Sequence, residues 1–286
     1  MAERKTRIVP IRRVLTDSPL ARQHEHNLAR RAGRTSSHAI PWSAFRREKY
    51  PAPALSLAHN AQKMLATGEY GAIDVFSRLA SALSLNGAPF DLVASAARIP
   101  SDEIRHADYA IRLASLFAGE DTVIEVDRNN FEKRWQKGID LPELDLLMLE
   151  VPAIGETLAG VLLTACQRRA SDPTVKAVFT SIVSDEVHHA RLGWYYLAWR
   201  APQWSRAEHQ RVADRAGEIV ADCERRFWRG RDAPAGSQKA AKALGVLDTV
   251  SQREVIRRVM EDEIVPALDA FGLGASHAWK VRRRGK

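Results

Sequence analysis

The sequence predicts an all-α fold: an antiparallel four-helix bundle of two helical hairpins joined by a long crossover, with extra C-terminal helices. Between residues 53 and 199, apolar residues recur at spacings of three and four, Ala and Leu are frequent, and β-branched runs are rare. Two polar turns, Asn86-Gly87-Ala88-Pro89 and Ser171-Asp172-Pro173, divide this region into hairpins. Because one hairpin cannot bury its apolar faces alone, we expect the two to pack on each other.

The expected helices follow from where the periodicity starts and stops. The first covers residues 56–84, the second follows the turn and ends at Gly119, and residues 120–141 form the crossover between hairpins. The third and fourth cover residues 142–169 and 173–199. Beyond Pro202, residues 207–228 and 251–271 are expected to be helical, with a linker at 230–237.

Composition places the chain among ordinary globular proteins. Its 286 residues are 45% hydrophobic and 27% charged, which excludes disorder throughout. We find no apolar run near the ~20 residues of a membrane span, no secretory leader, and only two scattered cysteines, so we expect a cytoplasmic protein without a disulfide framework.

The excess positive charge lies at the two ends of the chain. Residues 1–50 carry 12 Lys/Arg against 4 Asp/Glu, which accounts for the whole net charge of +8, and the tail around Arg282 to Arg284 is also basic. Without a nucleic-acid-binding motif, we expect no nucleic acid partner and no membrane contact. The expected organisation is a basic arm (1–52), the bundle (53–200) and additional helices with a basic tail (201–286).

Two helices carry the same charged motif inside an apolar face. Glu103 and His106 lie on the second helix, and Glu186 and His189 on the fourth. Residues three apart share a helix face, so each Glu-x-x-His pair can offer a carboxylate and an imidazole to one metal ion. Two such pairs carry little weight alone, because a surface salt bridge or a hydrogen-bonded core histidine is the favoured explanation of a single pair.

Position in the hairpins strengthens the case. Residues at equal height in an antiparallel hairpin are equidistant from its turn. The midpoint of Glu69 and Glu103 is residue 86, and that of Glu156 and Glu186 is residue 171, so both fall in the turns. Six residues are therefore predicted to converge as metal ligands and catalytic groups: Glu69, Glu103, His106, Glu156, Glu186 and His189. Buried without counter-ions, four carboxylates would be prohibitively costly, whereas two divalent cations neutralise them.

Other polar residues near the motifs receive different predictions. Asp74 and Glu150 fall on other helix faces, so we expect neither to be a ligand. Asp102 and Asp185 either accept the second ring N–H of a ligand histidine or are simply exposed. His188 is one position off the ligand face and should be solvated or lie behind the ligands.

Two prolines and three tyrosines leave alternatives open. Pro100 and Pro152 either kink their helices beside the site or, for Pro100, start a new helix, which would weaken the midpoint argument. Tyr70, Tyr109 and Tyr196 lie near the ligand turns, where packing is favoured over a role as radical relays.

With these residues in place, the chain resembles the ferritin-like superfamily of di-iron carboxylate proteins over about residues 56–200. That superfamily has the pattern Glu, Glu-x-x-His, Glu, Glu-x-x-His on four antiparallel helices, and all six positions are filled here. Asp-Glu-Ile-Arg-His-Ala and Asp-Glu-Val-His-His-Ala-Arg-Leu-Gly also look like bacterial members of the superfamily. Fold likeness does not choose among its oxygenases, reductase subunits, catalases, rubrerythrins and ferritins.

Features of the chain separate some of these classes. Rubrerythrins need a cysteine-rich site that is missing from this sequence, the extensions on both sides of the bundle disfavour a storage cage, and the intact second motif disfavours a manganese catalase. The resemblance implies a di-iron oxygenase with two Fe ions (Mn/Fe is also compatible), bridged by Glu103 and Glu186. It would use O2 to hydroxylate, desaturate or N-oxygenate a small organic substrate.

The resemblance also implies partners. Without a flavin or nicotinamide fingerprint, the iron would be reduced by an external electron donor such as a reductase or ferredoxin. A homodimer is compatible with the sequence. Two alternatives are a ferroxidase or peroxide-handling protein without organic substrate, and a metal-free structural bundle, for which Glu156→Ala would not reduce stability.

Overall fold

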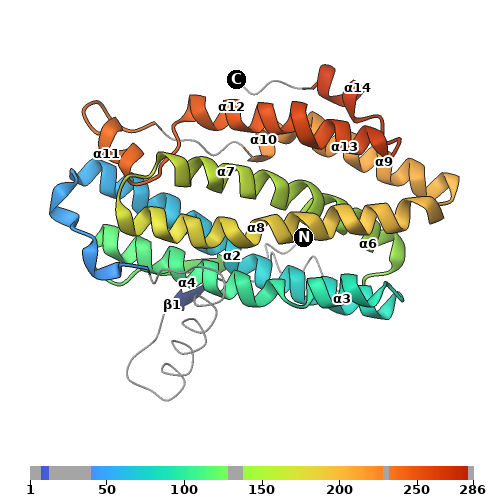
Figure 1. The fold of residues 1–286 in the computed structure, drawn as a ribbon, viewed down its shortest axis with the longest axis horizontal. Coiled ribbons are helices and arrows are strands. Elements are labelled where there is room, and N and C mark those ends of the chain that lie inside the picture. The colour runs from blue at the N-terminus through green and yellow to red at the C-terminus, as the bar shows by residue number, and fades with distance from the viewer. Residues whose placement is uncertain (1–7, 13–39, 128–137, 228–231, 283–286) are drawn as a thin grey trace, which may run out of the picture.

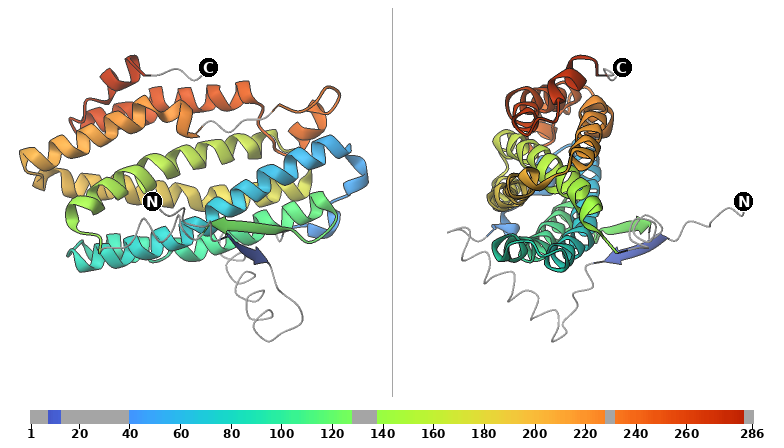
Figure 2. Two further views of the ribbon diagram at one scale, coloured as in Figure 1. Left: turned by 180° about the vertical axis from the view of Figure 1, so that it is seen from behind. Right: turned by 90° about the vertical axis from the view of Figure 1, so that its right-hand side faces the viewer.

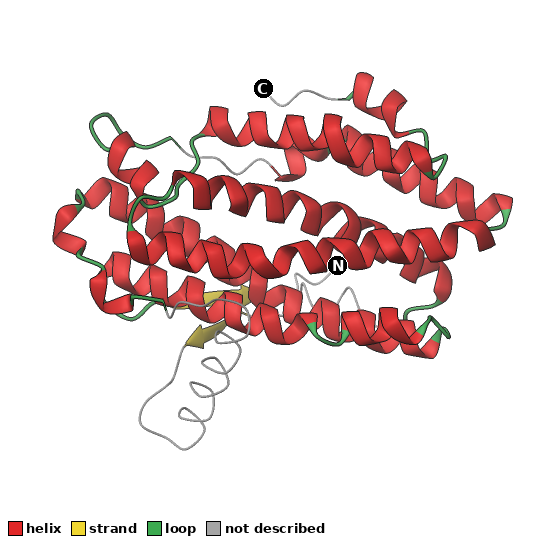
Figure 3. Ribbon diagram, in the orientation of Figure 1, coloured by secondary structure: helices red, strands yellow, loops and turns green. Residues whose placement is uncertain are grey.

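The computed structural model describes residues 8–12, 40–127, 138–227 and 232–282, and these are predominantly helical. Figure 3 shows long, roughly aligned helices and one small pair of strands. Helix α2 (Ala52–Leu85) is followed by α3 (Phe90–Ala96) and α4 (Ile99–Ala118), which run back along it. The predicted all-α class is thus confirmed in its coarse form.

The predicted second helix is divided in two. Pro100 lies in the first turn of α4, where its missing N–H costs no hydrogen bond, and residues 97–98 separate α4 from α3. One face, on which residues recur at the predicted spacing of three and four, nevertheless continues across the break, since all of its members are buried: Leu92, Ala96, Ile99, Glu103, His106, Ala110, Leu113 and Phe117. Gly119, with a φ of 81°, ends α4 as expected.

The second hairpin contains a helix with an irregular centre. Helix α6 (Leu141–Met148) passes through the π-helical segment η3 (Leu149–Gly155) into α7 (Glu156–Arg169), and α8 (Pro173–Arg200) returns beside it. Pro152 lies inside η3. Asp172 caps α8 by accepting hydrogen bonds from the Thr174 and Val175 amides.

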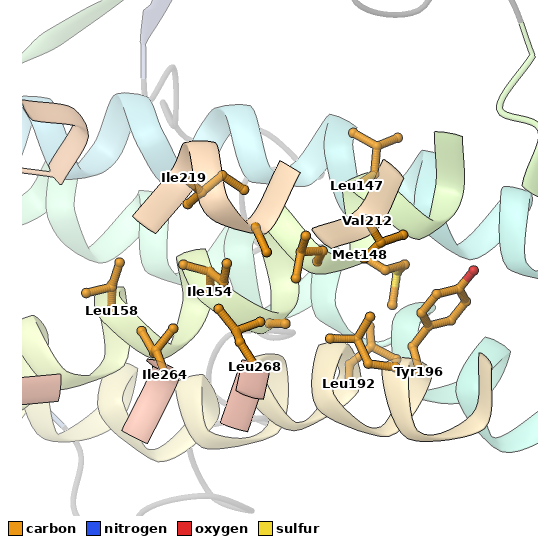
Figure 4. Close-up of a cluster of buried hydrophobic side chains, with 14 of the residues drawn as sticks. Leu147, Met148, Ile154, Leu158, Leu192, Tyr196, Val212, Ile219, Ile264 and Leu268 are labelled. Atoms are coloured by element: carbon orange, nitrogen blue, oxygen red, sulfur yellow. The ribbon is translucent and has the colours of Figure 1, made fainter. Parts of the chain in front are cut away.

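The C-terminal third forms another layer of helices. Figure 1 shows α7 and α8 between the α2–α4 pair and the C-terminal helices, with most long axes nearly aligned. The main elements of this third are α9 (Arg206–Ala221), α12 (Thr249–Val259), the π-helical η5 (Met260–Ile264) and α13 (Val265–Ala270). Figure 4 shows Val212, Ile219 and Leu268 packed with Ile154 and Leu192, so this layer shares one hydrophobic core with the second hairpin.

Several short elements were not predicted. Helix α10 (Cys223–Phe227) lies within the helix expected at 207–228 but is separated from α9 at Asp222, and α11 (Gln238–Ala243) and α14 (Ala275–Lys280) lie in segments for which no helix was expected. Strands β1 (Ile8–Arg12) and β2 (Val123–Asp127) pair antiparallel, which joins the N-terminal arm to the crossover. Figure 2 shows this ribbon protruding from the side of the helical layers.

The end of the predicted N-terminal arm packs on the helical layers. The segment from Ile40 to Tyr50 contains two short 3-10 turns, η1 (Trp42–Ala44) and η2 (Arg47–Lys49). Phe45 is buried against Phe117 at the end of α4, and the Tyr50 hydroxyl donates to Asp172 at 2.8 Å. These residues therefore cap one end of the helical layers.

One apolar stretch departs from the prediction. Among the described residues, Leu141–Arg169 is long and apolar enough to cross a membrane. The expectation that no such run exists is therefore wrong. A core helix passes the same test, and this one packs against α8 and α12 and carries Glu156.

Candidate metal centre

The six residues predicted as ligands lie together in the interior of the helical layers. Helix α2 supplies Glu69, α4 supplies Glu103 and His106, α7 begins with Glu156, and α8 supplies Glu186 and His189. They form three overlapping groups, in each of which one ligand atom per residue lies within 4.8 Å of the others: Glu103, His106 and His189; Glu69, His106 and Glu186; Glu156, Glu186 and His189. A buried group of this kind could hold a metal ion.

Glu103 and Glu186 occupy the middle of the cluster. The Oε1 atom of Glu103 lies 3.0 Å from Nδ1 of His189, and its Oε2 atom lies 3.6 Å from Nδ1 of His106. The carboxylate of Glu186 faces the same two nitrogens at 3.2 Å (His106) and 3.7 Å (His189). Each central carboxylate therefore contacts both imidazoles.

Glu69 and Glu156 group with different histidines. Glu69 approaches His106, with Oε2 3.9 Å from Nδ1, whereas Glu156 groups with Glu186 and His189. The cluster thus has two halves, each with one histidine and one outer carboxylate. The two central carboxylates belong to both halves.

The outer nitrogens of the histidines face aspartates from the opposite motif. His106 Nε2–H donates to Asp185 at 3.2 Å, and His189 Nε2 lies 3.6 Å from Asp102, beyond direct hydrogen-bond distance. Asp185 therefore accepts a ring N–H, as one of the two sequence alternatives predicted, whereas Asp102 faces His189 at a longer distance. This arrangement directs Nδ1 of each ring toward the central carboxylates.

Arg105 is a buried part of the site that the sequence analysis missed. Its side chain, 1% exposed, pairs with Asp185 and lies 3.4 Å from Asp102. It therefore joins the two aspartates that face the histidines. The available signal was its place within Asp-Glu-x-Arg-His, three residues after Asp102, which puts it on the same helix side as that carboxylate.

Several buried polar atoms of the cluster lack hydrogen-bond partners. Within the described part of the chain they include both carboxylate oxygens of Glu103, Oε2 of Glu186, and Nδ1 of both histidines. Buried polar groups are nearly always satisfied, and these orphaned atoms all point to one place. The donor set of carboxylate oxygens and imidazole nitrogens fits a divalent transition-metal ion.

The pKa values of the cluster reflect burial and close charges. Burial raises the pKa of Glu69 and Glu156 well above their usual range, and the carboxylates of Glu103 and Glu186 reinforce the rise. Burial opposes ionisation of Glu103, but its contacts with His106 and His189 outweigh that effect and lower its pKa. Glu69 and Glu156 therefore hold protons more tightly than Glu103 does.

Both histidines favour the charged form when the cluster holds no metal. Burial works against the charge on His106, yet its contacts with Asp185, Glu103 and Glu186 raise its pKa well above the ordinary value. For His189, contacts with Asp102 and Glu103 outweigh burial and raise the pKa to about 10. In the metal-free protein, the protonated imidazoles therefore offset part of the negative charge of the carboxylates.

The π-helical segment η3 explains how Glu156 reaches the interior. Met148 and Glu156 are eight residues apart, so a regular α-helix would place them about 80° apart around its axis. A π turn absorbs one extra residue, which reduces the offset to about 20°. Glu156 is thereby aligned with Met148, which is fully buried.

Close packing between α8 and η3 accompanies this alignment. Gly193 of α8 lies so near the η3 backbone that a Cβ built on it would be 2.1 Å from the amide nitrogen of Ala153. Only a glycine fits at this distance. On the same side of α8, Gly160 of α7 leaves 3.3 Å for a Cβ against Glu186.

The residues excluded from the ligand set lie outside the cluster. Asp74 forms an i,i+4 ion pair with Arg78 at 2.9 Å, Glu150 pairs with Arg215 of α9, and His188 is exposed. Tyr109 and Tyr196 are buried in hydrophobic clusters, and the Tyr196 hydroxyl donates to Asp145 at 2.7 Å. Tyr70 packs at the edge of a third cluster.

Comparisons with known proteins assign no relative to this chain. No family model, no curated protein and no solved structure matches it.

Proposed function

We propose that this protein is a non-haem di-iron oxygenase of the ferritin-like type. The observation that carries the proposal is the position of Glu103 and Glu186, each of which faces Nδ1 of both His106 and His189. A carboxylate shared by two half-sites is what a pair of cations needs as a bridge. Glu69 with His106, and Glu156 with His189, would complete the two coordination sets.

Formal charge favours two divalent ions over one. The four glutamates, Asp102 and Asp185 carry −6 when ionised, and Arg105 reduces this to −5. Two divalent cations would bring the total to −1, whereas one would leave −3 in a largely buried volume. Nitrogen and oxygen ligands suit Fe(II) and Mn(II), so both an Fe–Fe and a Mn–Fe pair remain compatible with the site.

When bound, the iron pair would supply the activation of O2 for oxidation of a small organic molecule. The chain's own residues would hold and orient the ions. Asp185 fixes the tautomer of His106 by accepting from Nε2, and Arg105 holds Asp185 in place. Phe76 is fully buried and its ring centroid lies 6.0 Å from that of His189, so it would help to exclude water from the cluster.

The helical hairpins support the ferritin-like part of this proposal. Helices α2, α3–α4, α6–α7 and α8 would supply the four long helices of such a bundle, and the C-terminal helices pack against its outer side. A return to Fe(II) requires electrons from a separate donor, for which we propose a reductase or ferredoxin. A cytoplasmic location, with neither membrane nor nucleic acid as partner, remains part of the proposal.

The first experiment is the metal content per chain of the purified protein. It is combined with an optical spectrum after anaerobic Fe(II) loading and exposure to O2. We expect about two iron ions per chain and a transient visible absorption band, and neither in the Glu156→Ala variant. Wild-type protein that binds no metal would overturn the proposal. Rapid oxidation of added Fe(II) in many turnovers without organic substrate would instead identify a ferroxidase.

A further inference from the structure

A pocket of about 320 Å³ lies beside the cluster and is lined by four helices and one turn. Helix α2 contributes Gln62 and Leu65, α7 contributes Leu162 and Leu163, α8 contributes Phe179 and α12 contributes Gln252. Residues 244–247, between α11 and α12, form a further wall. Its size falls at the lower end of the range for small-molecule sites. None of the six cluster residues lines it.

The pocket lies at a fixed distance from the cluster along the bundle. Gln62, Leu163 and Phe179 are each seven residues from the glutamate of their own helix, namely Glu69, Glu156 and Glu186. Seven residues are about two turns, or roughly 10 Å, and nearly the same helix face. All three steps lead toward the same end of the bundle, because α7 runs opposite to α2 and α8. The pocket therefore lies along the same inward helix faces as the six cluster residues, about two turns away.

Hydrogen bonds and close packing hold the wall formed by residues 244–247 in place. The backbone amides of Ser171 and Asp172 both donate to the Ala243 carbonyl at 3.1 Å, which ties the end of α11 to the turn between α7 and α8. Gly245 has a φ of 76° and lies so close to Phe179 that a Cβ would be 2.6 Å from its ring. This packing holds residues 244–247 in place over the pocket.

One polar atom in the pocket lacks a partner. Gln62 is 4% exposed, lines the pocket, and its Oε1 atom makes no hydrogen bond with any described residue. A buried acceptor without a donor costs about 1–3 kcal/mol. A ligand with a hydroxyl or N–H group would satisfy it.

The remaining lining limits the charge of the ligand. Most lining residues are apolar, and none of them is Asp, Glu, Lys, Arg or His. A carboxylate or ammonium group would be desolvated there without a counter-ion. An uncharged molecule with an aliphatic body and one donor group fits these conditions.

We propose that this pocket binds a neutral, largely apolar molecule whose single hydroxyl or N–H group donates to Gln62. Identifying this molecule as the substrate oxidised at the neighbouring centre rests on the proposed function. The binding itself is independent of that function, because none of the six cluster residues lines the pocket.

The test compares three small probes on the purified full-length protein by calorimetry. The probes are 1-octanol, its isomer 1-methoxyheptane, which has no donor, and octanoate, which is charged. We expect 1-octanol to bind at least tenfold more tightly than either of the others. Equal binding of 1-octanol and the ether, or preferred binding of octanoate, would overturn the assignment.

Two variants locate the binding. Gln62→Met keeps the length of the side chain but removes the acceptor, so 1-octanol should lose its advantage over the ether while the ether still binds. Leu162→Trp fills the pocket from a partly exposed position and should abolish binding of both. Leu85→Trp, at an exposed position of α2, is the matched control and should leave both affinities unchanged. Discrimination that survives Gln62→Met contradicts the proposal.

A relaxation measurement separates this inference from the proposed function. With Mn(II) loaded in place of iron, protons of bound 1-octanol should relax faster than in metal-free protein. The Glu156→Ala variant should lose that enhancement but keep its affinity for 1-octanol. Binding without any metal uptake would refute the di-iron centre alone. Metal uptake without binding of 1-octanol would refute the pocket assignment alone.

Discussion

His106 Nε2 donates to Asp185 at 3.2 Å, and Asp185 directly precedes the glutamate of the other motif. Each Asp-Glu-x-x-His segment therefore supports its partner: the aspartate of one helix faces the histidine of the other. In each motif the aspartate directly precedes the glutamate, so any shift of α4 along α8 would move both residues together. The glutamate cluster and the aspartate–histidine contacts therefore depend on the same register between α4 and α8.

Replacing Asp185 with asparagine tests this support. Because an amide can present N–H instead of an acceptor to the ring, we expect Asp185→Asn to weaken metal affinity by about 10- to 100-fold. A competition titration against a coloured chelator measures the change. Asp74→Asn, which alters a carboxylate of α2 outside the cluster, should leave the affinity within about twofold. Similar losses in both variants would show that Asp185 has no special role.

Metal uptake should release protons. The pKa values of Glu69, Glu156 and His106 are raised well above their usual values, and that of His189 is raised to about 10, so the metal-free cluster holds protons that bound metal ions must displace. We expect net release of protons on metal uptake, measured with a pH indicator in weakly buffered solution. Metal uptake without proton release would contradict the direction of these shifts.

The same shifts set how the metal-free protein responds to pH. For all four groups the folded protein binds protons more tightly than the unfolded chain, so their contribution is greatest at low pH and is lost as pH rises. For His189 this loss extends from about pH 6.5 to about 10. Urea unfolding of chelator-treated protein should therefore show stability that falls between pH 6 and 9. A rise over that interval would contradict the sign.

The Glu156→Ala variant separates the effect of the buried carboxylate on stability from its role in metal binding. Burial disfavours the carboxylate in the absence of metal, so the metal-free variant should be at least as stable as metal-free wild type. Wild type should gain about 2.7 kcal/mol at a free metal concentration 100 times the Kd, and the variant should gain far less. Denaturant melts with and without metal measure both effects. An equal gain in both proteins would remove Glu156 from the site.

Two glycines in helices should respond oppositely to alanine. Gly193→Ala would force a Cβ into the backbone of Ala153, and we expect it to destabilise the fold by about 1–3 kcal/mol. Gly68→Ala, in the middle of α2 with nothing within 4 Å of the new Cβ, should stabilise it by about 0.4–1 kcal/mol. Thermal or urea unfolding of the pair gives the comparison. A stable Gly193→Ala protein would mean that α8 and η3 can separate.

Hydropathy patterns were sufficient to predict the long helices and the helix faces that are buried. The buried face from Leu92 to Phe117 appeared in the sequence as a regular spacing, and it survived the break before Pro100 because α3 and α4 remain in phase. Counting from the turns placed the four glutamates at one height. Those arguments need only local geometry.

Other features depend on tertiary contacts that local patterns do not contain. Strand β2 was not predicted, and its partner β1 lies more than 100 residues earlier in the chain. The short helix α11 is held by the turn at Ser171, and Arg105 is buried because two aspartates surround it. The extra residue absorbed in η3 has no composition signature beyond Pro152.

That extra residue also affects how this chain should be compared with others. Between Met148 and Glu156 it contains one residue more than a regular helix with the same two inward faces requires. An alignment that forbids gaps within helices would therefore pair Glu156 with a neighbour of the corresponding residue in any protein with a straight helix here. The correct alignment places a one-residue gap inside the helix, within Leu149–Gly155.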